Sequence, residues 1–154
     1  MIDTFAYCVT ISLSVVYILC LVQCLKAKSL NGLFWIYTIV YCLTILSYAI
    51  VIIRTPGLAT FRQFTFEVPV SLDTALKRWC SKCMIVKPKM VKHCHYCDVC
   101  FENWDHHCPW TTKCVAGRNL VIFYIFLCGV VAFLILSMSM VMNIVSKDDE
   151  NSGF

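Results

Sequence analysis

The sequence predicts an α-helical integral membrane protein in which three membrane-crossing helices carry a small cysteine-rich module between the second and the third. Two observations support this fold class. Hydrophobic residues make up 60% of the 154-residue chain and charged residues 14%, against roughly 45–50% and about 25% in soluble domains. Seven of the twelve cysteines and all four histidines lie between Cys80 and Cys114. The chain therefore combines membrane segments with one segment rich in metal-ligand residue types.

Three uncharged stretches account for the hydrophobic composition, and they are Thr4 to Leu25, Ser29 to Ile53 and Asn119 to Ser146. Each exceeds the roughly 20 residues that an α-helix needs to cross a bilayer. Lipid-exposed loops are excluded, because their unpaired backbone groups would lie in hydrocarbon. We therefore expect transmembrane helices over residues 4–25, 33–53 and 119–145. The first stretch lacks a basic segment before it and a clear cleavage site, so we interpret it as a retained helix.

The remaining residues divide by composition into a linker, a module and a tail. Arg54 ends the second helix, and Pro56 and Gly57 turn the chain away from the membrane. The linker shows no strong helical or alternating period, whereas the module holds the cysteines and histidines and the tail is acidic. The expected ranges of linker, cysteine-rich module and tail are 54–77, 78–118 and 146–154.

The module offers eleven candidate metal ligands. Cys80 and Cys83 form one Cys-x2-Cys knuckle, and Cys94 and Cys97 form a second. The two residues between the cysteines of a knuckle let both of its sulfurs point at one ion. Two closed tetrahedral sites would use eight ligands and leave three over. Spacing alone leaves open which of the others complete which site: Cys100, Cys108, Cys114 and the four histidines. A disulfide framework is the alternative, but an odd number of cysteines and the dense histidines count against it.

The module is too short and too polar to hold a hydrophobic core of its own. Metal binding is therefore expected to supply most of its folding energy. Pro88, between Val86 and Met90, suggests a small β-hairpin that links the knuckles.

The residue order from Cys80 to Phe123 is C-x2-C-x9-H-C-x2-C-x2-C-x4-D-H-H-C-P-W-x3-C-V-x3-N-x3-F. This order resembles the cysteine-rich domain of the DHHC protein S-acyltransferases. The resemblance implies two interleaved Cys3His zinc sites and a nucleophilic cysteine, Cys108, outside both. The implied ligands are Cys80, Cys83, His93 and Cys100 for one site and Cys94, Cys97, His107 and Cys114 for the other. His106 can then accept the proton of Cys108, and Asp105 can orient the imidazole.

The resemblance implies a protein S-acyltransferase that moves a long-chain (palmitoyl) group from acyl-CoA to cysteine thiols of substrate proteins, through a thioester on Cys108. Both zinc ions would be structural, because four protein ligands leave no open position. The residues expected to meet acyl-CoA are Trp110, Lys113 and Arg118, with a solvated basic face as the alternative for the two cations. One face of the third helix, with Phe126, Val130 and Phe133, is a candidate lining for the acyl chain, with plain helix packing as the alternative.

Charge predicts the orientation, because ten of the thirteen Lys and Arg residues lie between Arg54 and Arg118. The positive-inside tendency then puts the module in the cytosol, where reducing conditions suit thiolate–zinc bonds. The expected location is a eukaryotic endomembrane (Golgi or ER) or the plasma membrane. The expected partners are the membrane, acyl-CoA and substrate proteins with cytosolic cysteines. Nucleic-acid binding is not expected, since no recognition helix presents the basic residues.

Departures from the family pattern support an alternative function. Lys113 stands where the family commonly has Asn, and Ala116 where it commonly has Gly. Family members typically have four helices or more, whereas this sequence ends eight residues after Ser146, so we expect a product truncated after the third helix. The alternative is a catalytically silent zinc-bearing membrane protein that regulates or derives from such an enzyme. A RING-type interaction module is less favoured, because that pattern needs a closing Cys-x2-Cys pair, whereas five residues separate Cys108 from Cys114.

Overall fold

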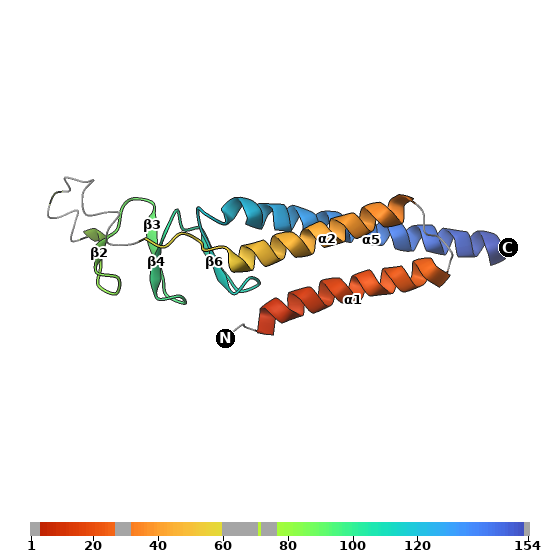
Figure 1. Ribbon diagram of the computed structural model, residues 1–154, viewed down its shortest axis with the longest axis horizontal. Helices are drawn as coiled ribbons and strands as arrows, with labels where there is room; N and C mark the ends of the chain where they lie inside the picture. Colours follow the sequence, from red (N-terminus) through yellow and green to blue (C-terminus); the bar gives the residue numbers. More distant parts are fainter. Residues whose placement is uncertain (1–3, 27–31, 60–70, 72–76, 153–154) are drawn as a thin grey trace. The chain divides into compact units, whose positions relative to one another are not determined.

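The computed structural model describes residues 4–26, 32–59, 71 and 77–152. The chain forms two compact units (Figure 1). The helical unit comprises Met1–Ile50 and Ile122–Phe154, and the β-structured unit comprises Val51–Val121. Most of the expected linker, residues 60–70 and 72–76, lies outside the described residues.

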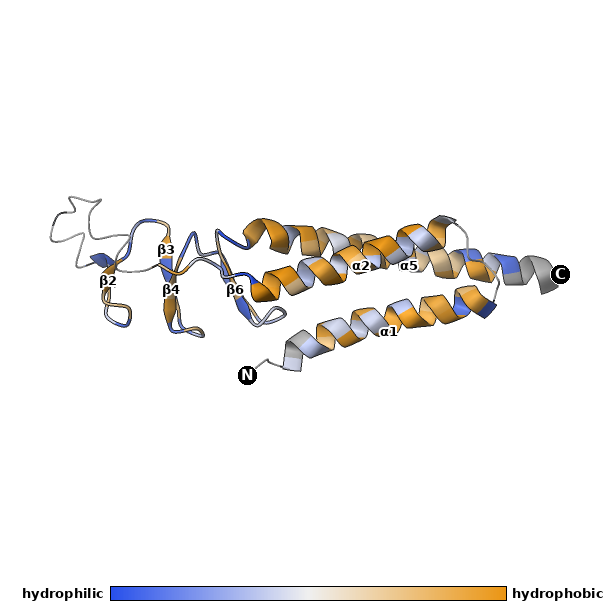
Figure 2. Cartoon of the chain, in the orientation of Figure 1, coloured by the Kyte–Doolittle hydropathy of each residue, from blue (hydrophilic) through white to orange (hydrophobic). Residues whose placement is uncertain are grey.

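Three long helices make up the helical unit, and they are α1 (Thr4–Lys26), α2 (Gly32–Ile53) and α5 (Leu120–Ser152). Each is long and apolar enough to cross a membrane, and hydrophobic residues cover most of their length in Figure 2. These helices confirm the fold class expected from the uncharged stretches. The last helix runs further than expected, because residues 146–152 of the acidic segment are also helical.

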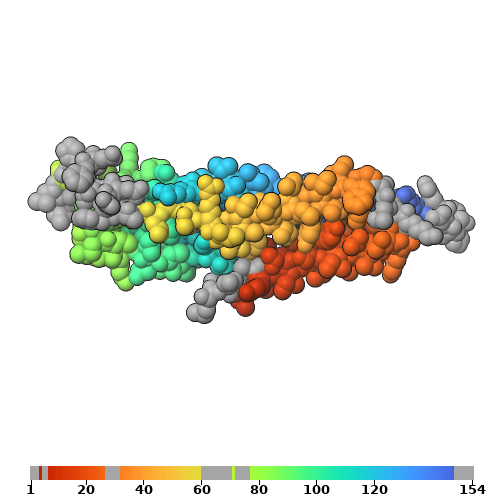
Figure 3. Space-filling view, in the orientation of Figure 1, coloured from red at the N-terminus to blue at the C-terminus, as the bar shows by residue number. Residues whose placement is uncertain are grey.

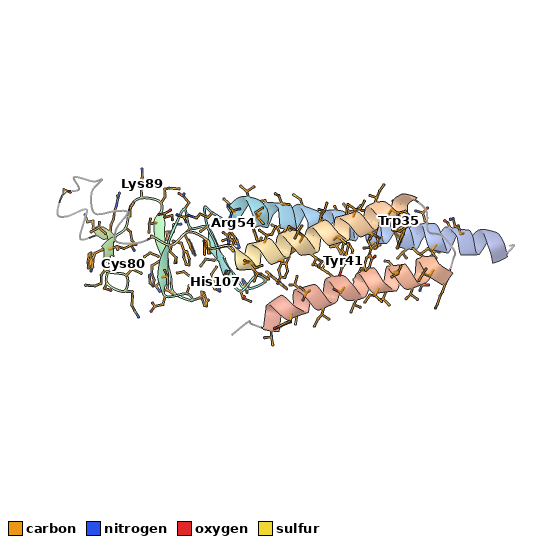
Figure 4. The ribbon with its side chains drawn as sticks, viewed as in Figure 1. Trp35, Tyr41, Arg54, Cys80, Lys89 and His107 are labelled. Carbon is orange, nitrogen blue, oxygen red and sulfur yellow. The ribbon has the colours of Figure 1, made fainter. Side chains whose placement is uncertain are left out.

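Aromatic and hydroxyl side chains join α1 to α2. The rings of Tyr17 and Tyr41 stack with centroids 4.2 Å apart, and the Tyr41 hydroxyl lies 3.0 Å from Oγ of Ser14. Figure 4 shows Tyr41 directed from α2 toward α1, and the side chains of the two helices close against each other in Figure 3. Such polar pairs help to hold helices together in lipid, where the hydrophobic effect does not drive helix association.

The contact between α2 and α5 is also aromatic, with a close approach at one glycine. Phe133 is fully buried and stacks on Tyr37 at 5.1 Å, and Phe126 lies 4.9 Å from the Tyr48 ring. A Cβ atom at Gly129 would lie 2.6 Å from Oγ1 of Thr44. The two phenylalanines considered as an acyl-chain lining therefore pack against α2, which favours the helix-packing interpretation.

The β-structured unit contains three two-stranded antiparallel hairpins. Their strands are β1 (Trp79–Cys80) with β2 (Ile85–Val86), β3 (Val91–Cys94) with β4 (Val99–Glu102), and β5 (His106–Cys108) with β6 (Lys113–Val115). The expected β-hairpin structure is thus confirmed. The position of the hairpins differs from the expectation. Each Cys-x2-Cys knuckle forms the turn within a hairpin, whereas Pro88 lies in the connection from β2 to β3, which belong to different sheets.

Small apolar clusters that include the cysteines hold the hairpins together. Ile85 and Val91 pack beside Cys100, and Phe101 and Ala116 pack beside other cysteines of the module. The segment after α2 adds to the outer edge of β4, through an Ala59 N–H bond to the Cys100 carbonyl at 2.9 Å. Each cluster is small, as expected for a module whose stability depends on bound metal.

Candidate metal centres and Cys108

Two groups of four side chains in the β-structured unit could each hold a metal ion. In each group the ligand atoms lie within 4.8 Å of one another, and the groups are Cys80, Cys83, His93, Cys100 and Cys94, Cys97, His107, Cys114. Figure 4 labels one ligand from each group, Cys80 and His107, which belong to different hairpins. The structure therefore brings together the same two sets that the resemblance implied.

The separations within the groups fit a tetrahedral zinc ion. With Zn–S bonds of about 2.3 Å and Zn–N bonds of about 2.0–2.1 Å, a tetrahedron separates sulfur from nitrogen by about 3.6 Å and sulfur from sulfur by about 3.8 Å. The sulfur to Nδ1 separations are 3.4–3.6 Å in the first group and 3.4–3.7 Å in the second. One sulfur pair of the second group is 3.6 Å apart. Four donors per group would close the coordination sphere.

Strand pairing explains why these residues meet. His93 lies directly opposite Cys100 in the second hairpin, and His107 lies directly opposite Cys114 in the third. Directly opposite residues point to the same face of a hairpin, with Cβ atoms about 4.5–5.5 Å apart. Each group thus combines the knuckle of one hairpin with the His/Cys pair of the next hairpin.

Neighbouring residues of β3 serve different groups. His93 belongs to the first group and Cys94 to the second, because successive strand residues point to opposite faces. The middle hairpin therefore links both groups. In the view of Figure 1 the three hairpins follow one another in chain order.

The electrostatics of the sulfurs fit metal binding. Burial raises the pKa of the Cys100 thiol. For Cys80, burial also raises the pKa, but hydrogen bonds from the backbone amides of Cys83 and Lys82 contribute to a net lowering. A metal ion must displace protons from such thiols, so its affinity rises with pH.

Two further side chains contact the groups from outside. Oδ1 of Asp98 lies 3.3 Å from Nε2 of His93, the ring nitrogen that faces away from the sulfurs. The indole nitrogen of Trp104 is buried without a conventional hydrogen-bond partner among the described residues. Its ring packs in the cluster that contains Cys94 and Cys114. Burial raises the pKa of the Cys114 thiol, and the Trp104 N–H acts in the opposite direction.

Sequence inspection did not find the 14-residue repeat behind this arrangement. The first knuckle cysteine recurs at Cys80, Cys94 and Cys108, and the histidine at His93 and His107. The backbone repeats as well, since the residue four positions after each of these cysteines has φ near 55°: Met84 (φ 55), Asp98 (φ 53) and Thr112 (φ 54). The equal spacing of cysteines was the signal that could have revealed it.

Cys108 ends strand β5 and is 3% exposed. Of the seven cysteines between residues 80 and 114, all of which are described, it alone lies outside both groups. His106 precedes it by two residues on the same strand, so both side chains point to the same face,. Oδ2 of Asp105 lies 3.5 Å from Nδ1 of His106. The three candidate catalytic residues therefore lie within four positions of one another, on β5 and at the residue that precedes it.

The candidate acyl-CoA contacts lie around the turn that follows Cys108. Lys113 is directly opposite Cys108 in the hairpin, and its ammonium donates to the carbonyl of Ile52 in the last turn of α2. Trp110 is 59% exposed at the turn. The side chain of Arg118 is exposed and lies against Gly57. Two cations and one aromatic side chain thus lie in the hairpin of Cys108 or shortly after it, and the ammonium of Lys113 has a backbone partner.

Comparison with known proteins agrees with these features. The DHHC palmitoyltransferase family model matches residues 73–154, more than half of the chain. Palmitoyltransferase ZDHHC14 of Mus musculus is 34% identical over 90 residues, which cover 58% of this chain and 18% of that protein. Palmitoyltransferase ZDHHC18 of Mus musculus is 39% identical over 77 residues (49% and 20%), and Palmitoyltransferase ZDHHC5-A of Danio rerio is 44% identical over 55 residues (36% and 7%). The chain spans about a fifth or less of the length of these curated relatives.

Proposed function

The chain belongs to the DHHC palmitoyltransferase family, and from this premise we propose that it is a protein-cysteine S-acyltransferase whose acyl-enzyme thioester forms on Cys108. The supporting observation is that Cys108 lies outside two complete Cys3His groups. Its sulfur is therefore available for nucleophilic chemistry, whereas the six cysteines of the groups have the geometry of zinc ligands. Zinc bound there is structural, because it has no open coordination position.

The reaction exchanges one thioester for another in two steps. Cys108 Sγ attacks the carbonyl carbon of a long-chain acyl-CoA such as palmitoyl-CoA, and the bond from that carbon to the coenzyme sulfur breaks. The thiol proton passes to His106 and from there to the departing coenzyme thiolate. A substrate cysteine then attacks the acyl-enzyme, and its proton returns to the Cys108 sulfur by the same route. Proton transfer of this kind contributes on the order of 10²–10⁴ in rate.

The strand geometry supports these roles. His106 and Cys108 share one face of β5, whereas His107 points to the opposite face, where it meets Cys114. Adjacent histidines thus have different tasks, one in proton transfer and one in metal binding. Asp105, 3.5 Å from the His106 ring, stabilises the imidazolium that forms when His106 accepts the proton.

The acyl donor and the substrates follow from the same proposal. Long acyl chains partition into membranes, with about 0.8 kcal/mol for each buried methylene, so a membrane enzyme meets its donor at the bilayer. Lys113, Arg118 and Trp110 are the proposed contacts for the anionic coenzyme. The module faces the cytosol of a Golgi, ER or plasma membrane, and the acceptors are cytosolic cysteines of membrane-associated proteins.

One observation favours a second candidate, a catalytically silent zinc-bearing membrane protein. The Cys108 side chain is 3% exposed, and buried cysteines are generally inert toward electrophiles. In that case the chain would act by binding another protein, such as a longer relative.

Acyl-CoA incubation separates the two candidates. The purified full chain in detergent is incubated with palmitoyl-CoA and its intact mass is measured, beside Cys108→Ser as the matched control. An acyl adduct that hydroxylamine removes and that Cys108→Ser lacks supports the acyltransferase. An unmodified wild-type chain that still holds two zinc ions supports the silent protein.

A further inference from the structure

The turn after Cys108 repeats the form of the two metal-binding turns. We call residues 108–112 the third turn, because it closes the third hairpin as the knuckles close the first two. Its fifth residue, Thr112, has φ 54, matching Met84 (φ 55) and Asp98 (φ 53). Left-handed φ is uncommon for residues other than glycine, so three such values at 14-residue intervals indicate one turn used three times.

The third turn differs from the other two at one ligand position. Cys83 and Cys97 are the second cysteines of the two knuckles, and Thr111 stands 14 residues after Cys97. Thr111 is fully buried, and its hydroxyl donates to the Cys108 carbonyl at 3.4 Å. A hydroxyl thus occupies the position from which a thiolate would bind metal.

Among the residues that the structure describes, no His/Cys pair stands where the second half of a third metal group would be. Each complete group takes its His/Cys pair from the following hairpin. After the third hairpin the chain enters α5 at Leu120. The side-chain oxygen of Asn119 accepts a hydrogen bond from the Ala116 N–H at 2.8 Å and so stabilises this connection. On the face of Cys108 the hairpin instead meets the last turn of α2, through the bond from Lys113 to Ile52.

We propose that Cys108 occupies the first-ligand position of a vacated third knuckle, and that Thr111 is the positioning residue that keeps its sulfur free of metal. Zinc and cadmium bind strongly to paired thiolates, and a lone cysteine beside a hydroxyl offers only one. A sulfur bound to zinc would be unavailable to attack an acyl-CoA. Position 111 therefore determines whether the sulfur of Cys108 reacts with a metal ion or with a carbonyl carbon.

The inference deepens the proposed function, since it rests on Cys108 as the nucleophile, but it predicts a metal-binding result that needs no acylation. Thr111→Cys restores the missing ligand at nearly unchanged side-chain size. The full chain in detergent is titrated with Cd²⁺, desalted, and weighed by native mass spectrometry. Wild type and Thr111→Val are expected to retain two ions, and Thr111→Cys three.

The double variant Cys108→Ser/Thr111→Cys identifies the third site. It is expected to return to two ions, because both sulfurs of the restored knuckle are needed. Retention of two ions or fewer by Thr111→Cys, while Thr111→Val keeps two, overturns the inference. Three ions in the double variant also overturn it, since the extra ion would then lie elsewhere.

Acyl labelling of the wild-type chain reports separately on the proposed function. If wild type forms no acyl adduct but Thr111→Cys binds a third ion, the proposed acyltransferase function is rejected and the inference of a vacated third knuckle is retained. An adduct on Cys108 without a third ion in Thr111→Cys rejects the vacated knuckle alone. When both hold, the third ion in Thr111→Cys is expected to lower acyl labelling at least tenfold, and chelation of that ion is expected to restore it.

Discussion

Oδ1 of Asp98 lies 3.3 Å from Nε2 of His93, on the side of the imidazole opposite to the nitrogen that faces three sulfurs. A carboxylate in this position accepts the second ring N–H, fixes the tautomer and makes the other nitrogen a better metal ligand. Asp98 also lies 3.6 Å from the Lys82 ammonium. The first metal group therefore has an outer carboxylate supplied by the turn of the next hairpin.

Asp98→Asn is expected to weaken zinc binding at the first group by about 10–100-fold. Asparagine tolerates the left-handed backbone of this position, so the change removes the charge without straining the turn. Competition with a chromophoric chelator measures the affinity of each ion. Lys82→Gln is the matched control, because it removes the other partner of Asp98 and should leave both ions bound as in wild type. Equal affinities in Asp98→Asn and wild type would show that His93 needs no outer carboxylate.

His107→Ala and His106→Ala are expected to separate metal binding from catalysis. His107→Ala should lose the zinc of the second group and the fold of the third hairpin, because His107 Nδ1 faces all three sulfurs of that group. His106→Ala should keep both ions and lose acyl labelling, on the order of 10²–10⁴ in rate. Zinc content by mass spectrometry and acyl labelling are measured on the same preparations. The assignment is wrong if both variants hold equal amounts of zinc.

Trp104→Phe is expected to speed zinc loss from the second group. The Trp104 ring packs in the cluster that contains Cys114, and its buried N–H counteracts the rise that burial causes in the pKa of the Cys114 thiol, so its removal should weaken the bond from Cys114 to zinc. Cobalt substitution supplies a second measurement, because the sulfur-to-cobalt charge-transfer band should shift when the donor is removed. Trp110→Phe is the control, since that indole lies at an exposed turn. An unchanged band and release rate in Trp104→Phe would exclude the interaction.

Gly129→Ala is expected to destabilise the helical unit by about 1–3 kcal/mol, the usual cost of overpacking. Its Cβ would lie 2.6 Å from Oγ1 of Thr44, which would push α5 away from α2. The thermal midpoint in detergent measures the loss. Gly32→Ala is the matched control, since a Cβ there has no neighbour within 4 Å among the described residues. Thr44→Ala should restore part of the stability in the double variant, and a purely local helix effect would give no such recovery.

Sequence predicted the helices well because uncharged length is a sufficient signal for crossing a bilayer. It did not predict the end of α5, which continues to Ser152 through charged residues, since helical propensity rather than hydrophobicity decides the backbone there. The number of hairpins was not predicted either, because strands of two to four residues are too short to show an alternating pattern,. Counting ligands from the residues alone left the partners of each knuckle open.

Strand register decides which His/Cys pair completes which knuckle, and the spacing of the ligands in the sequence does not reveal that register. His93 and Cys100 are seven residues apart, and only the hairpin between them shows that they stand opposite each other. The roles of Cys108, His106 and Asp105 remain predictions, because they depend on chemistry that geometry alone does not test. The third turn could have been predicted from the sequence, because Cys80, Cys94 and Cys108 are equally spaced.

The order in which the hairpins are joined gives the two ions unequal importance. Each group of four ligands is a link between one hairpin and the next. Oxidation at the first link would detach the outermost hairpin and leave the strand that carries Cys108 anchored. The same damage at the second link would remove the ligand bonds that join that strand to the middle hairpin. Oxidation of the second group's cysteines, Cys94, Cys97 and Cys114, should therefore affect the Cys108 strand far more than oxidation of the first group's cysteines, Cys80, Cys83 and Cys100.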